Sequence, residues 1–334
     1  MIGLHIFHYA GFFGAQIFNT VLAILIVKRA GKLFGSYRHV MFVFTFCSML
    51  YSAVEIIAQP VLYMKGPMFV VFLDNNVFSQ GIGNVVACLH CGTFGFLISV
   101  FAAQFFYRYI ALCRQSLLSY FDGYKIFLIF IPCVITYILW FELVVWGMSA
   151  TMEKRIYLKD DFKNMYESDS MMISFIAPLY WNNGPNREKV WRFKDAASAL
   201  VCTGIIGSLT TLICFFALRI YLKMQKEKGH MSKRTLELNR QLYIMLSIQT
   251  IVPFITMYIP VGLFIVLPFF DMGLGAYVNY PSASMSLYPA IEPLIAIYCI
   301  KDFRKTIANF FRRVRVGPNG ISVYSTSGTQ MAIK

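Results

Sequence analysis

The sequence predicts an all-α membrane protein, a bundle of seven transmembrane helices. Of its 334 residues, 58% are hydrophobic and 14% are charged, and the mean hydropathy is +0.61. Soluble domains carry about 25% charged residues, so a water-soluble fold has no way to bury this much apolar surface. Apolar stretches recur along the whole chain, which favours one membrane bundle over separate soluble domains.

Seven windows are apolar over about 20 residues, the length an α-helix needs to cross a hydrocarbon core of roughly 30 Å. They lie near residues 7–27, 40–62, 84–107, 126–148, 196–222, 241–267 and 281–300. Together they define a receptor bundle over residues 1–300. An odd number of spans places the two termini on opposite sides of the membrane.

The distribution of Lys and Arg predicts the orientation. The connectors 28–39, 108–125 and 219–240 and the segment after residue 300 contain 21 of the 30 basic residues, and cytoplasmic loops are enriched in Lys and Arg. The connector 149–195 carries eight basic residues but also seven acids, and a loop of this length translocates with less regard to charge. We therefore expect the N-terminus outside and the C-terminus in the cytoplasm.

The net charge of +14 predicts contact with membrane lipids rather than nucleic acid, because the basic residues lie between apolar segments and form no continuous patch. In 301–316, Phe303, Ile307 and Phe310 share one helical face, with basic residues between them. We expect a short amphipathic helix on the membrane surface. Residues 317–334 are rich in Ser, Thr and Gly, which predicts a disordered cytoplasmic tail.

Several motifs resemble those of one receptor family. The segment 105–114 reads FFYRYIALCR, 239–242 reads NRQL, 288–295 reads YPAIEPLI and 35–38 reads GSYR. In combination they resemble the signatures of the nematode Str-class seven-transmembrane chemoreceptors, or serpentine receptors. The layout is similar to that of the diacetyl odorant receptor. The resemblance reaches every part of the chain except the loop 149–195 and the last residues.

The resemblance implies a G-protein-coupled chemosensory receptor for olfaction. Such a receptor detects a small odorant or a soluble attractant or repellent and activates a Gα protein. The implied location is the plasma membrane, in the cilium of chemosensory neurons, with an accessory protein for ciliary delivery. The loop 149–195 contains no Cys, so the outer-loop disulfide of rhodopsin-like receptors has no counterpart here.

Two other classes of function compete with a receptor. We expect no enzyme, no cofactor and no metal site, because HExxH, GxSxG, paired CxxC and phosphate-loop patterns are absent and the five His lack metal-ligand spacing. The alternative is a ligand-gated channel or a transporter of small molecules. Insect-type odorant channels have the opposite orientation, and no internal repeat supports an inverted-repeat transporter.

The outer halves of the windows supply an apolar lining with a few polar groups, as small-molecule pockets have. The candidate ligand-binding residues are His90, Phe94, Glu142, Cys202, Tyr258 and Tyr288. His90 and Glu142 lie at similar depth and form either a ligand-facing polar pair or a structural tie between two helices. The aromatic side chains fit packing as well as ligand contact.

Three acids, Glu55, Glu142 and Glu292, lie inside predicted spans. A charge at mid-membrane costs roughly 2.5 kcal/mol or more, so we expect each acid to face the interior. Glu55 and Glu292 fall near mid-membrane on helices that neighbour each other in this topology. They are candidates for an intramembrane polar pair, and the alternative is that each hydrogen-bonds the backbone locally.

The candidates for G-protein coupling lie at the cytoplasmic side: Tyr107, Arg108 and Tyr109 where the third span ends, and Arg234 in the third inner loop. By position alone Arg108 fits a snorkelling anchor, and the resemblance favours contact with Gα. Pro253 in the sixth window removes a backbone hydrogen bond and permits a bend. We expect the sixth helix to swing outward below it and open a cavity lined by Arg108.

Overall fold

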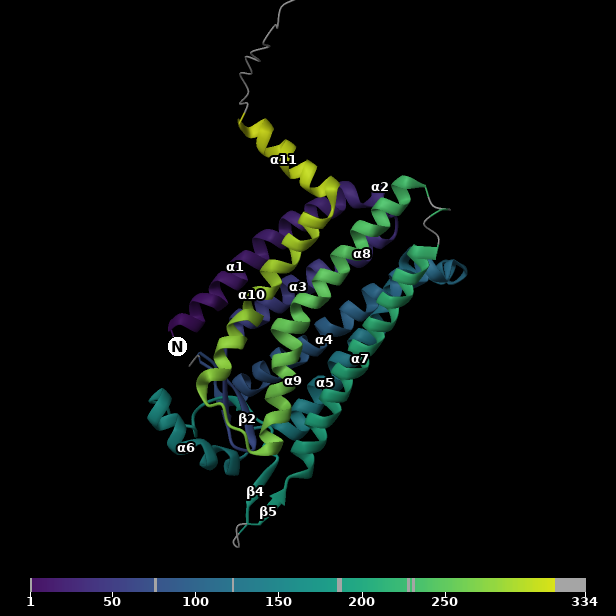
Figure 1. Ribbon diagram of the computed structural model, residues 1–334. Coiled ribbons are helices and arrows are strands. Elements are labelled where there is room, and N and C mark those ends of the chain that lie inside the picture. The colour runs from purple at the N-terminus through teal and green to yellow at the C-terminus, as the bar shows by residue number, and fades with distance from the viewer. Residues whose placement is uncertain are drawn as a thin grey trace, which may run out of the picture.

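Long helices lie side by side in an elongated bundle, as the computed structural model shows (Figure 1). The structure describes residues 2–74, 77–121, 123–184, 188–226, 229 and 232–315, so the predicted tail 317–334 lies outside the described residues. In the described part, six helices are long and apolar enough to cross a membrane. The helix pair at the end of the chain, bent by 95°, passes the same test as a unit. The predicted seven-helix class is thereby confirmed.

The helices follow the predicted windows. Their bounds are α1 Ile2–Leu25, η1 Ile26–Ala30, α2 Gly31–Phe34, α3 Tyr37–Ala58, α4 Gln80–Cys113, η2 Gln115–Phe121, η3 Gly123–Phe130, α5 Ile131–Met148, α6 Met152–Tyr166, α7 Phe193–Lys226, α8 Lys233–Pro253, η4 Phe254–Tyr258, α9 Ile259–Val266, η5 Leu267–Phe270, η6 Ala276–Val278, α10 Asn279–Cys299 and α11 Lys301–Arg315. The second helix ends at Ala58, four residues before the predicted window does, because Gln59 adopts a left-handed conformation with φ of 42°. Pro60, which follows, begins a strand.

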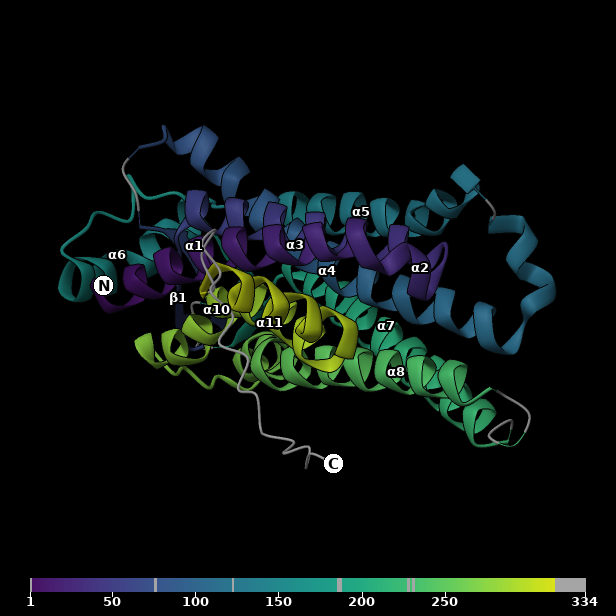
Figure 2. The same cartoon turned by 90° about the horizontal axis from the view of Figure 1, so that it is seen from above.

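The central helix of the bundle is α4, which contacts α3, α5 and α7. Its contact with α5 depends on small residues. A Cβ added at Gly95 would lie 2.6 Å from a ring atom of Trp140, so only Gly allows the two helices to approach this closely. On the other side of the bundle, α10 lies beside α1 in both views (Figures 1 and 2).

The sixth predicted window is covered by α8, η4 and α9. The π-helical turn η4 follows Pro253 directly, and α9 has Pro260 in its first turn. Proline supplies no backbone N–H, and a π-turn marks a break in the regular α-helical ladder. The helix is therefore irregular where the sequence predicted a bend.

One end of the bundle carries β-structure that the sequence did not predict. Strands β1 (Pro60–Lys65), β2 (Met68–Leu73) and β3 (Phe175–Ile176) form an antiparallel sheet, and β4 (Trp181–Asn183) pairs with β5 (Lys189–Trp191). We call this end the sheet end (Figure 1). The opposite end, where α11 begins, is the α11 end.

The β1–β2 hairpin separates two apolar cores. Leu62 and Val71 belong to the main core of the bundle, whereas Val61, Val70 and Phe72 pack in a second core together with α6. Successive residues of a strand point to opposite faces, so the hairpin buries both of its faces. It thus forms a layer between α6 and the helices.

A buried ion pair fixes α6 to the start of α7. The Lys154 ammonium is 2.5 Å from the Asp195 carboxylate and donates a hydrogen bond to the carbonyl of Ser149 at 3.0 Å. Only 1% of Lys154 is exposed. Burial lowers the pKa of the Lys154 ammonium, and the Asp195 charge opposes that shift. The cap over the bundle is therefore held by charge as well as by apolar packing.

Candidate functional site

A cavity of about 100 Å³ lies beneath the sheet, between the helices. We call it the sheet cavity. Leu62, Phe69 and Val71 of the hairpin contribute to its lining on the side of the sheet, and Trp140 of α5 and Val261 of α9 contribute side walls. Its lining is mostly apolar, so the few polar groups at its edge determine where a bound molecule can form hydrogen bonds.

Those polar groups are centred on the Glu55 carboxylate. His90 Nε2 lies 2.7 Å from one oxygen of Glu55, and the Ser286 hydroxyl donates to the other at 2.7 Å. His8 Nδ1 lies 3.4 Å from that second oxygen and 3.0 Å from the Ser286 hydroxyl. We call these four residues the Glu55 cluster. They come from α1, α3, α4 and α10, so the cluster joins four helices around one acid.

The Glu55 cluster is buried, which determines what its acid requires from its neighbours. Glu55 is 4% exposed and His8 is 1% exposed. A carboxylate in such surroundings needs hydrogen-bonding partners beside it, and the Ser286 hydroxyl and the two imidazoles are placed to provide them. Since Glu55 and His90 also line the sheet cavity, the cluster presents a polar spot to whatever binds there.

Three of the six predicted ligand-binding residues, His90, Phe94 and Cys202, line the sheet cavity. Tyr258 and Tyr288 do not. The Tyr258 ring packs against Phe94 with its centroid 5.7 Å away, so it supports a cavity wall from behind.

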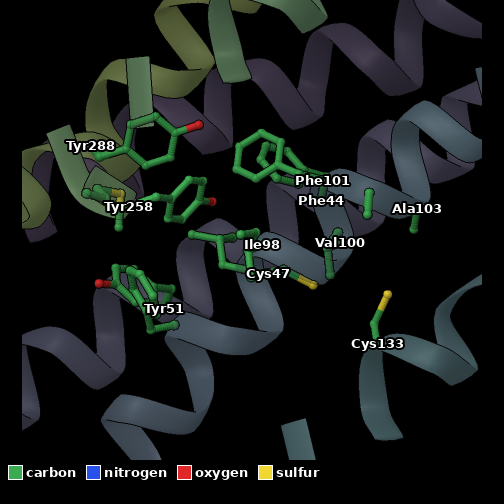
Figure 3. Close-up of a cluster of buried hydrophobic side chains, with 14 of the residues drawn as sticks. Phe44, Cys47, Tyr51, Ile98, Val100, Phe101, Ala103, Cys133, Tyr258 and Tyr288 are labelled. Carbon is green, nitrogen blue, oxygen red and sulfur yellow. The ribbon is translucent and has the colours of Figure 1, made fainter. Parts of the chain in front are cut away.

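Tyr288 belongs to a deeper layer of the core. Its hydroxyl donates to the backbone carbonyl of Gln249 at 3.0 Å, and its ring centroid is 6.2 Å from that of Phe101. Figure 3 shows Tyr288 beside Phe101 and Phe44 in this layer. Tyr288 lies in the interior of the bundle, but its contacts are with neighbouring helices and not with the sheet cavity.

The predictions for Glu142 are wrong in two respects. The partner of His90 is Glu55, and Glu142 lies on the exposed face of α5 rather than in the interior. Trp140 and Val144 point into the bundle. With 3.6 residues per turn, position 142 is about half a turn away from both. Similar depth in the membrane therefore did not identify the partner of His90, because the position of Glu142 around the axis of α5 turns its side chain outward.

The structure gives Glu55 and Glu292, the candidates for an intramembrane polar pair, different hydrogen-bond partners. The Gln249 side-chain amide donates to Glu292 Oε1, whereas Glu55 is bound by the two His and Ser286. Ser286 precedes Glu292 by six residues on α10, which is about 9 Å along a helix that rises 1.5 Å per residue. The two acids therefore occupy separate layers with separate partners.

Sequence reasoning missed two members of the cluster, His8 and Ser286, and the contribution of the hairpin. A His inside an otherwise apolar first window was the available signal for His8. Ser286 gave none, because a Ser in an apolar helix is common. The hairpin spans the end of the predicted window 40–62 and the connector that follows it.

At the α11 end, Arg108 is buried rather than snorkelling to the surface. It is 7% exposed, and its guanidinium donates to the Asn239 side-chain oxygen at 2.8 Å. The guanidinium also lies 5.1 Å from the centre of the Tyr37 ring, which stacks on Tyr107. Arg108 and Tyr107 thus belong to one cluster that links α4 to α3 and α8.

The two other residues predicted for coupling lie apart from that cluster. The Tyr109 ring packs 5.2 Å from the Phe216 ring of α7. Arg234 is exposed in the first turn of α8. The role of all four residues in coupling stays a prediction.

Comparison with known proteins connects this architecture to a receptor family. The sequence model of the family described as "Serpentine type 7TM GPCR chemoreceptor Str" matches residues 4–308. The chain is similar to the serpentine receptor class r-10 of Caenorhabditis briggsae, with 28% identity over 87% of this chain and 86% of the relative. The Caenorhabditis elegans receptor of that name matches equally well, at 28% identity over 87% and 86%. The C. elegans G-protein coupled receptor str-33 is 24% identical over 90% of this chain and 88% of its own length.

The separate layers of Glu55 and Glu292 generate a prediction for the free energy of unfolding. Residues in contact couple by about 0.5 to 3 kcal/mol, whereas distant residues without shared partners are additive within about 0.5 kcal/mol. We expect Glu55→Gln to be coupled to His90→Gln and additive with Glu292→Gln. Double-mutant cycles on the thermal unfolding of the purified protein measure both. Additivity of Glu55→Gln with His90→Gln would contradict the cluster.

Proposed function

The chain belongs to the Str family of serpentine seven-transmembrane chemoreceptors, and from that membership we propose that it detects a small odorant or soluble attractant or repellent and activates a Gα protein. The chain is a multi-pass membrane protein, and members of a G-protein-coupled receptor family generally have a small-molecule ligand and a G-protein partner. The observation that carries the ligand proposal is the apolar sheet cavity with the Glu55 cluster at its edge.

The size and lining of the cavity define the class of ligand. A cavity of about 150 Å³ with apolar walls holds a benzene molecule, so the sheet cavity of about 100 Å³ suits a molecule of that size or smaller. His90 Nδ1 is buried without a hydrogen-bond partner among the described residues. The proposed ligand is therefore a small, largely apolar molecule with one hydrogen-bonding group that reaches His90.

The proposed orientation places the sheet end outside the cell and the α11 end in the cytoplasm. It is supported by the 21 of 30 Lys and Arg residues in three connectors and the segment after residue 300. In this orientation the ligand cavity faces the environment and Arg108 lies toward the G protein. We propose the ciliary plasma membrane of a chemosensory neuron as the location, with an accessory protein for delivery and α11 lying on the inner leaflet.

The proposed mechanism connects the cavity to Arg108 through α8. Phe94 lines the cavity and touches Tyr258, which lies in the π-turn η4. Movement of η4 is transmitted to α8, whose Asn239 holds Arg108. A ligand that binds better when α8 has moved outward shifts the equilibrium to that state, at about 1.4 kcal/mol for each tenfold change. Arg108, Tyr109 and Arg234 are then available to Gα.

The orientation predicts the accessibility of tags. An epitope tag at the N-terminus should be stained on intact cells, and a tag within 219–240 only after permeabilisation. Quantitative immunofluorescence on surface-expressed receptor measures both. Staining of the N-terminal tag only in permeabilised cells would reverse the orientation.

Filling the sheet cavity tests the ligand site. Cys202→Phe places a ring in a cavity of about 100 Å³, and we expect at least a tenfold rise in the ligand concentration that gives half-maximal response. Cys214→Phe is the matched control, because Cys214 is exposed on the same helix. A panel of volatiles and small solutes, tested by Ca²⁺ imaging of cells with equal surface expression, gives the measurement. Equal responses of both variants and the wild type would place the ligand elsewhere.

Removing the guanidinium tests coupling. Arg108→Ala should abolish ligand-evoked nucleotide exchange on Gα, because no other side chain of the Tyr37–Tyr107 cluster carries a positive charge toward the cytoplasm. Lys125→Ala serves as the control, since Lys125 is exposed in the second inner connector. Guanine-nucleotide exchange is compared at matched surface levels. Unchanged potency and amplitude in Arg108→Ala would assign Arg108 a purely structural role.

A further inference from the structure

A second, much smaller cavity lies between the sheet cavity and Arg108. Its volume is about 10 Å³, and Thr45, Gln104, Gln249 and Glu292 are its polar lining residues. We call it the Glu292 chamber. A space of about 10 to 15 Å³ is the least that holds one water molecule. The four residues come from α3, α4, α8 and α10, so anything bound there contacts four helices.

Three polar atoms on the residues of this chamber lack a partner. Gln104 Nε2, Gln249 Oε1 and Glu292 Oε2 are buried without a hydrogen bond to any described residue. The exposed fractions of the three side chains are 1%, 2% and 1%. A buried polar atom without a partner is destabilising, so three on the residues around one space indicate a site for a polar ligand.

The hydrogen bonds that the lining residues already form determine which of their donors and acceptors remain available to a bound molecule. Tyr37 donates its hydroxyl to Gln104 Oε1 at 3.3 Å, which leaves the Gln104 NH₂ unused. The Gln249 NH₂ donates to Glu292 Oε1, which leaves Gln249 Oε1 unused. The Thr45 hydroxyl donates to the carbonyl of Met41 at 2.9 Å and keeps its lone pairs. The chamber therefore offers one amide donor, two acceptors and the second oxygen of Glu292.

The charge of Glu292 has no counterion among the described residues. Its side chain forms no ion pair with a described Lys, Arg or His. The groups that face its layer are the phenols of Tyr37 and Tyr288, and Arg108 lies one turn beyond Gln104 on α4, bound to Asn239. An ionised carboxylate without a counterion is unfavourable in a membrane interior, so the neutral acid is favoured here.

We propose that the Glu292 chamber binds one water molecule and that Glu292 is protonated beside it. The water accepts hydrogen bonds from the Gln104 amide and from the Glu292 carboxyl group, and it donates to Gln249 Oε1 and the Thr45 hydroxyl. All three partnerless atoms are then satisfied, and the water has the two to four partners that buried waters require. A sodium ion fits less well, because the Gln104 NH₂ group points a partial positive charge at the site.

The proposal goes beyond ligand detection, because it concerns the bundle without a ligand. Gln249 lies on α8, four residues before Pro253 and the π-turn η4. The bound water links Gln249 to α3, α4 and α10, so outward movement of α8 has to break this set of hydrogen bonds. The chamber thus stabilises the closed position of the same helix that holds Arg108 through Asn239.

Infrared spectroscopy of the purified receptor tests the protonation. A buried carboxylic acid has a C=O stretching band that a carboxylate lacks. We expect this band in the wild type, its loss in Glu292→Gln, and its retention in the control Glu153→Gln, whose acid is exposed on α6 outside the spans and pairs with Arg192. A spectrum in which Glu292→Gln removes only carboxylate absorption would overturn the proposal.

Two further measurements separate water from a cation and do not depend on a variant. The melting temperature of the wild type should be equal in sodium chloride and choline chloride at the same ionic strength, and a rise specific to sodium would overturn the water assignment. A high-resolution density map of the wild type should show one solvent peak in contact with Gln104, Gln249 and Glu292. A well-resolved map without that peak would overturn it as well.

Discussion

The arrangement of this bundle depends on the need to satisfy polar groups where no water is available. In hydrocarbon, apolar packing alone gives little preference among helix arrangements, since lipid tails are as apolar as the side chains. Polar groups do favour one helix arrangement over others, because each of them needs a partner inside the protein. Glu55 binds groups from α1, α4 and α10, and Arg108 binds a group from α8. These two layers tie α1, α3, α4, α8 and α10 to one another at two heights in the bundle.

The sheet end meets the same requirement with strands. The β1–β2 hairpin satisfies its backbone by pairing and separates the core of the bundle from the core under α6. Rhodopsin-like receptors tie their outer loop with a disulfide, and 149–195 contains no Cys. Here β3 joins the hairpin, and the buried Lys154–Asp195 ion pair fixes α6. An anchored cap of this kind gives the sheet cavity a defined shape on the side of the strands.

The sequence predicted the helices well because their signal is local: about 20 consecutive apolar residues are enough. It did not predict the hairpin, because 60–73 is apolar on both faces and therefore lacks the alternation that identifies a strand. For the site, His90, Phe94 and Cys202 line the sheet cavity, and their role in ligand binding stays a prediction. The sequence did not predict the partners of His90 and Glu292, since a partner across the bundle depends on helical phase and on the relative height of two helices. The position of a residue within its own window gives neither the helical phase nor the height relative to another helix.

The positions of the polar layers also restrict how a signal crosses the bundle. Helices α1, α3, α4 and α10 are joined at the Glu55 cluster, whereas the interrupted helix α8–η4–α9 contributes no residue to it. In the interior, side chains of α8 bond instead to Glu292 through Gln249 and to Arg108 through Asn239, both below the sheet cavity. Breaking those bonds costs less than separating a carboxylate from two imidazoles, because one of them joins neutral amide and acid groups. Helix α8 can therefore move while the four helices of the Glu55 cluster stay together, and the π-turn η4 that follows it places Tyr258 against Phe94 at the cavity wall.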